Sequence, residues 1–99
     1  MSPCRKKRCC RNLEGQRGFK PMGIPGIGLP VNYIALDEFE AIRLCDLEGK
    51  NQIQAGEVMG VSRGTIQRLL KSGRAKIVEA LLKDRIIIID DPQEDTKNE

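Results

Sequence analysis

The stretch QIQAGEVMGVSRGTIQRLLK, residues 52–71, decides the fold of this chain. Two short segments with helical apolar spacing are separated by Gly60, and Ser62 follows at once. Glycine ends a helix well because a left-handed backbone costs it little, and serine accepts hydrogen bonds from the amides that open the next helix. The pattern therefore predicts two helices, one over about 52–59 and one beginning after Ser62, joined by a tight turn.

The same stretch meets the position-specific demands of a helix-turn-helix. Counted from Gln52, its fifth residue, Gly56, is small where the second helix crosses, and its ninth, Gly60, ends the first helix. Because these requirements are met at one register, we favour a helix-turn-helix over an ordinary bend between packed helices. Apolar residues fall where the two helices must touch, at Ala55, Met59, Val61, Ile66 and Leu69.

The helix after Ser62 should run to about residue 82, and its exposed side indicates duplex DNA. At 100° per residue, its arginine, lysine and glutamine side chains gather on one side. Arg63 and Gln67 lie near the N-terminal end, which a recognition helix presents to base edges in the major groove. Arginine suits guanine and glutamine suits adenine, and the remaining cations suit phosphates. The predicted DNA-binding residues of this helix are Ser62, Arg63, Gly64, Thr65, Gln67, Arg68, Lys71 and Arg74.

The other side of this helix is predicted to be its buried side. Apolar or small residues recur there at steps of three and four, which is typical of a helix that packs on a core along its whole length. The predicted buried set is Ile66, Leu69, Leu70, Gly73, Ile77, Ala80 and Leu81.

Charge is strongly segregated, although the net charge is only +3. Residues 1–20 carry seven Lys or Arg against one Glu, whereas residues 90–99 carry five acids against one Lys. We interpret 1–18 as a flexible basic arm, 19–90 as the DNA-binding domain and 91–99 as a disordered acidic tail, because the two ends have too few apolar residues to pack. The arm should add phosphate or minor-groove contacts through Arg5, Lys6, Lys7 and Arg8.

The rest of the chain supplies a third helix and short strands. We expect a helix from Asp37, as its N-cap, to about Glu48, ending at Gly49. Residues 31–35 and 86–89 are β-branched and strand-like, and the second run cannot stay an open edge without inviting aggregation. It should pair with 31–35 of the same chain or with another subunit. The predicted fold is mainly α, a trihelical core with a helix-turn-helix plus a short strand or hairpin.

The four cysteines are interpreted as thiols rather than disulfides, because the sequence shows no secretory signal. Cys4, Cys9 and Cys10 lie in the basic arm, and there is no His. Their spacing is not the usual C-x2-C clip, so we predict no metal and no cofactor, with a metal or redox role of the arm as the alternative. Cys45 is expected to be a small core residue.

Several function classes lack support. No apolar run approaches the roughly 18–20 residues that cross a bilayer, so we expect a cytoplasmic protein. Without His, a nucleophile elbow or a phosphate loop, no enzyme is predicted. An RNA-binding role lacks an aromatic stacking platform, since the chain has one Tyr, two Phe and no Trp. A protein-interaction module on the same scaffold stays open as an alternative.

Three segments together resemble one family: FKPMGIP at 19–25, LDEFEAIRLCDLEG at 36–49 and QAGEVMGVSRGTIQRLL at 54–70. It is the family of small predicted DNA-binding proteins called domain of unknown function 134, whose helices are similar to region four of bacterial sigma factors. The resemblance covers about residues 19–89 and implies a prokaryotic, cytosolic protein with a trihelical DNA-binding core. Gly64 and Gly73 depart from the family pattern, where we expect a Gln-like residue and Ala.

The sequence thus predicts a sequence-specific duplex-DNA-binding protein that regulates transcription through a helix-turn-helix. Its partner is double-stranded DNA, and a homodimer is left open, since a second copy would double the contact and impose half-site spacing.

Overall fold

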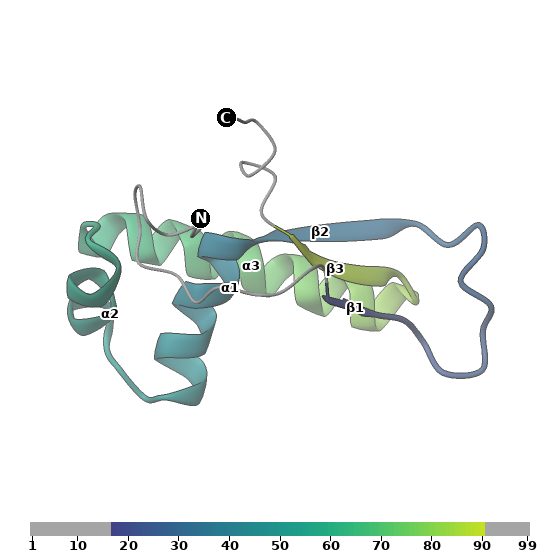
Figure 1. The fold of residues 1–99 in the computed structure, drawn as a ribbon, viewed down its shortest axis with the longest axis horizontal. Coiled ribbons are helices and arrows are strands. Elements are labelled where there is room, and N and C mark those ends of the chain that lie inside the picture. Colours follow the sequence, from purple (N-terminus) through teal and green to yellow (C-terminus); the bar gives the residue numbers. More distant parts are fainter. Residues whose placement is uncertain (1–16, 91–99) are drawn as a thin grey trace.

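The computed structural model describes residues 17–90 as three helices and a small sheet. The helices are α1 (Leu36–Ile42), α2 (Gln52–Met59) and α3 (Arg63–Lys83), and a π-helical turn, η1 (Arg43–Leu47), continues α1. The strands are β1 (Arg17–Phe19), β2 (Val31–Ala35) and β3 (Ile86–Asp90). The long helix α3 extends along the molecule, with α2 beside its N-terminal end and the sheet over its C-terminal half (Figure 1). The predicted fold, mainly α with a trihelical core and short strands, is confirmed.

The last strand along the chain is the central strand of the sheet. β3 pairs in parallel with β2, from Val31 opposite Ile86 to Ala35 opposite Asp90, which confirms the pairing predicted within one chain. β3 also pairs antiparallel with β1, where Arg17 lies opposite Ile89. β1 is not predicted from the sequence, because its three exposed residues, one of them glycine, carry no strand pattern. The strand places Arg17 and Gly18 in the sheet rather than in the basic arm.

One face of the sheet lies against α3. In β2, Asn32 and Ile34 are buried while Tyr33 between them is exposed, as the pleat requires. The Asn32 amide donates to the Lys76 carbonyl at 2.9 Å and to the Glu79 carboxylate at 3.0 Å. The second of these bonds is the main reason that the pKa of Glu79 is lowered. A buried polar side chain with partners of this kind fixes the strand in one position on the helix.

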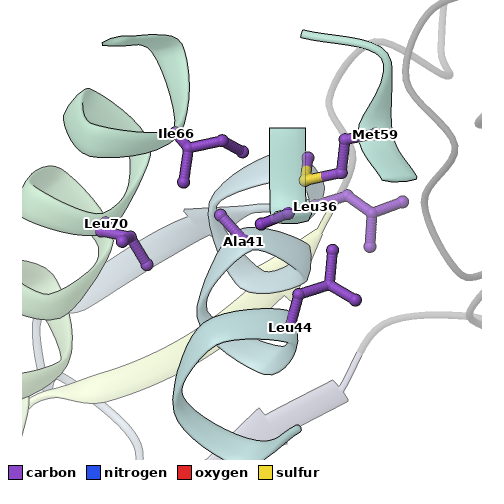
Figure 2. Close-up of a cluster of buried hydrophobic side chains, with 7 residues drawn as sticks. Leu36, Ala41, Leu44, Met59, Ile66 and Leu70 are labelled. Atoms are coloured by element: carbon purple, nitrogen blue, oxygen red, sulfur yellow. The ribbon is translucent and has the colours of Figure 1, made fainter. Parts of the chain in front are cut away.

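The helices meet in a small aliphatic core. Figure 2 shows side chains of α1, η1, α2 and α3 turned toward one another. The fully buried members are all aliphatic or small, and Phe39 packs against them from a partly buried position. The buried members of the core are Leu36, Ala41, Leu44, Ala55, Met59, Ile66 and Leu70.

The start of α1 differs from the prediction. Asp37 is not the N-cap, because the helix already begins at Leu36 and Ala35 precedes it. The carboxylate of Glu38 accepts the Ala35 amide at 3.0 Å, so the cap is supplied from the third helical position and the chain turns straight out of β2. The end was predicted correctly, since Gly49 follows η1 with a φ of +79°.

The prediction that Leu81 belongs to the buried side of α3 is wrong, because this residue is 71% exposed. Eighteen residues at 100° make five full turns, so Leu81 lies on the side of Arg63 and not on that of Ile66. The buried residues of α3 are Ile66, Leu70, Gly73 and Ala80, and the helix continues without interruption through Gly73.

Candidate nucleic-acid interface

Two glycines make the turn between α2 and α3. A Cβ on Gly56 would lie 2.6 Å from the Val61 carbonyl oxygen, closer than real side chains approach a backbone atom. Gly60 has a φ of +76°, the left-handed conformation in which glycine is favoured. The close crossing and the helix end predicted from these two residues are confirmed.

Side-chain caps fix the first turns of both helices. Ser62 is the N-cap of α3, as predicted, and its hydroxyl accepts the Thr65 amide at 3.2 Å. In α2 the caps are reciprocal, since Asn51 accepts the Gln54 amide at 2.8 Å and Gln54 accepts the Asn51 amide at 2.9 Å. These bonds satisfy amides that no helical carbonyl reaches, so the start of α3 is held in a defined position.

The polar face of α3 is exposed where the sequence placed it. Arg63, Gln67, Arg68 and Lys71 are all exposed, and no acidic residue occurs between Glu57 and Glu79. Arginine and lysine here are therefore not neutralised by acids of their own helix. A rigid, positively charged helix face of this kind attracts polyanions.

These side chains differ in what they contact. Arg63 donates to the Gln52 side chain at 3.2 Å, which links the first residues of α3 and α2. Arg68 donates to the Thr65 hydroxyl at 3.2 Å. Within residues 17–90, Lys71 and Gln67 form neither a side-chain hydrogen bond nor an ion pair, so both are available to a ligand. Gln52 was not among the predicted site residues, although its place at the start of the first helix of the motif was the available signal.

The next cations along α3 are paired with acids of α1 and η1. Arg74 donates two hydrogen bonds to Asp46, at 3.1 and 2.6 Å, and this pairing raises the pKa of the guanidinium. Lys76 donates to Glu38 at 2.9 Å. Arg74, one of the predicted DNA-binding residues, is thus engaged within the protein, whereas Lys71 one turn earlier is not.

The remaining predicted site residues are not on α3. Arg5, Lys6, Lys7 and Arg8, and the alternative metal ligands Cys4, Cys9 and Cys10, fall outside the described residues. Between residues 17 and 90, no cluster of His, Cys, Asp and Glu could hold a metal ion. Cys45 packs half-buried against the core, where burial raises the pKa of its thiol. None of the helices in this part of the chain is long and apolar enough to cross a membrane.

Comparison with known proteins identifies relatives in bacteria and archaea. UPF0251 proteins of Prosthecochloris aestuarii and Aeromonas salmonicida are 41% and 43% identical over 88 and 81 residues, covering 86% and 82% of this chain. The UPF0251 protein PF0620 of Pyrococcus furiosus is 45% identical over 87 residues, 86% of this chain. The chain spans 57%, 79% and 80% of these three proteins. No solved structure is significantly similar to it.

A family model described as "Protein of unknown function DUF134" matches residues 1–97. With nearly the whole sequence matched and relatives above 40% identity, the chain belongs to the DUF134 family.

Proposed function

We propose that this protein binds duplex DNA through α3 and acts as a transcriptional regulator. The observation that carries the proposal is the exposed face of α3, where Arg63, Gln67, Arg68 and Lys71 stand on a capped helix with no acid nearby on it. A helix-turn-helix places the N-terminal part of its second helix in the major groove. This is the part of α3 that carries the four side chains.

The proposed contacts divide by chemistry. Arg63 and Gln67 reach base edges, because they lie in the first two turns of α3 and carry bidentate groups. Lys71 and Arg68 bind phosphates, which contributes affinity that is independent of sequence. Arg63 enters the groove already oriented, since its bond to Gln52 limits its freedom in the free protein.

Binding to duplex DNA at several salt concentrations tests the proposal. For the wild type, the logarithm of affinity should fall linearly with the logarithm of salt concentration. The double variant Arg63→Ala, Lys71→Ala should bind more weakly and show a shallower salt dependence. No binding by the wild type at low salt would reject the proposal.

A matched pair of single variants removes the effect of net charge. Lys71→Ala and Lys83→Ala each delete one exposed lysine from α3, twelve positions apart. Lys83 lies at the C-terminal end of the helix, 3.7 Å from Glu79. Only Lys71→Ala should reduce the salt slope, by about one. Equal losses would mean that the protein attracts DNA by its overall charge and not through the start of α3.

A further inference from the structure

The three glycines inside helices α2 and α3 occupy quite different surroundings. A Cβ on Gly56 would lie 2.6 Å from the Val61 carbonyl oxygen, and one on Gly73 would lie 2.7 Å from the Ile42 Cδ1 atom. Gly56 is required by the fold, because its Cβ would collide with main-chain atoms. At Gly73 a Cβ would displace the end of the Ile42 side chain and press on Glu38, so this glycine is explained by close packing between α3 and α1.

No close contact of this kind explains the glycine at position 64. It is the second residue of α3, its φ is not positive, and a Cβ there would be 3.9 Å from its nearest neighbours, the ends of Arg68 and Ser62. That distance is ordinary van der Waals contact with side-chain atoms, so the protein alone would accept alanine. Glycine is also a poorer helix former than alanine, which makes its presence unfavourable for the free protein.

The position of Gly64 gives the glycine a different role. At 100° per residue it projects between Gln67 and Lys71 on one side and Arg68 on the other, in the middle of the polar face. It is therefore a notch among the four side chains that we propose to contact DNA. A side chain in this notch would be the first group to meet the floor of the major groove.

We infer that Gly64 is a specificity-determining position that sets how deeply α3 enters the major groove. Its missing Cβ lets the main chain of the first turn approach the base edges, so that Arg63 and Gln67 reach them with bidentate geometry. The phosphate contact of Lys71 lies about two turns further along α3 and does not depend on the notch. This inference rests on the proposed function.

The substitution Gly64→Ala tests this inference, because it should weaken recognition of a specific DNA sequence without lowering the stability of the protein. The probes are a duplex selected from a random-sequence pool by the wild-type protein and a mixed-sequence duplex. We expect the variant to unfold at the same temperature as the wild type or up to about 6 °C higher. Its affinity for the selected duplex should fall about 10-fold or more, while its affinity for mixed-sequence DNA and its salt slope stay unchanged.

Ala75→Gly provides the matched control, because it makes the opposite change at an exposed position of the same helix. It should lower the unfolding temperature and leave both affinities unchanged. Undiminished binding of Gly64→Ala to the selected duplex would overturn the inference. A fall in its affinity for both the selected and the mixed-sequence duplex, together with a lower unfolding temperature, would also overturn it. The proposed function would still stand in either case if Lys71→Ala weakens binding. Absence of DNA binding by the wild type would reject both.

Discussion

Arg74 of α3 donates two hydrogen bonds to the carboxylate of Asp46, at 3.1 Å from Nε and 2.6 Å from Nη2. The pair joins α3 to η1 at a point where both side chains are about half exposed. An exposed pair of this kind stabilises a protein by less than about 1 kcal/mol. The pair has a greater effect on charge, because Asp46 neutralises Arg74, the next cation after Lys71 along α3.

Under the proposed function, releasing Arg74 should strengthen DNA binding. Asp46→Asn removes a negative charge beside α3 and frees the guanidinium for a phosphate, so we expect about 3- to 10-fold tighter binding at low salt and a salt slope steeper by about one. The measurement is a titration of duplex DNA at several salt concentrations. Asp84→Asn is the control, since it also removes one negative charge but at the C-terminal end of α3. Asparagine tolerates the left-handed φ of +57° at that position. Equal affinities of the Asp46 variant and the wild type would show that Arg74 is not near DNA.

Gly73→Ala should destabilise the protein, although alanine is the better helix former. Its Cβ would lie 2.7 Å from the Ile42 Cδ1 atom and 3.2 Å from the Glu38 Cβ atom, so the Ile42 side chain would have to leave its present position and Glu38 would have to give by a few tenths of an ångström. We expect a loss of about 1–3 kcal/mol in the free energy of unfolding, measured by urea denaturation. Gly64→Ala, whose Cβ would make only ordinary van der Waals contacts at 3.9 Å, should not be destabilised. A Gly73 variant as stable as the wild type would mean that the Ile42 side chain moves aside freely.

Glu38 should make stability depend on pH. Burial raises the pKa of its carboxyl, but hydrogen bonds from Ser72, Lys76 and the Ala35 amide outweigh burial and lower it below the ordinary 4.5. A folded-state pKa below the unfolded one stabilises the native protein above pH 4.5, and this contribution disappears as the pH falls through the lower value. Urea denaturation at intervals from pH 7 to pH 3 measures the effect. Glu38→Gln should be less stable at neutral pH, by about 1–2 kcal/mol, and should lose less stability on acidification. Parallel pH profiles for the two proteins would exclude this role.

Asn32 should be the most sensitive polar residue of the sheet. Its amide nitrogen donates to Lys76 and Glu79, and its oxygen accepts the Arg85 Nε at 2.8 Å. Asn32→Ala leaves these groups without their partner beneath the sheet, which should cost about 2–3 kcal/mol in chemical denaturation. A double-mutant cycle with Arg85→Ala should give a coupling energy of about 1 kcal/mol. Additive effects would mean that the bond contributes no stability of its own.

The turn of the helix-turn-helix was predictable because its requirements are local. Gly56, Gly60 and Ser62 each act on residues within a few positions, so their spacing in the sequence already describes the geometry. The exposed polar face of α3 followed from helical periodicity alone. Gly73 was correctly assigned to the buried side, but its contact with Ile42 depends on how α1 crosses α3, and no local pattern contains that distance.

The partners of the cations were not predictable for the same reason. Arg74 and Lys76 pair with Asp46 and Glu38, which are 28 and 38 residues away in the sequence. Such pairs form only after α1 and α3 have packed. The strand β1 also escaped prediction, since Arg17–Phe19 becomes a strand through the edge that β3 offers and not through its own composition.

The central place of β3 has a consequence for the order in which the molecule assembles. During synthesis β1 and β2 are made first, but each pairs only with β3, and some fifty residues separate Ala35 from Ile86. The contacts between α2 and α3 are short in sequence and need not wait for the sheet. A nascent chain that has not yet reached Ile86 therefore contains the whole helix-turn-helix sequence but lacks the strand with which β1 and β2 pair. Within residues 17–90, β3 is the last strand made, and only its arrival supplies the pairing partner of both β1 and β2.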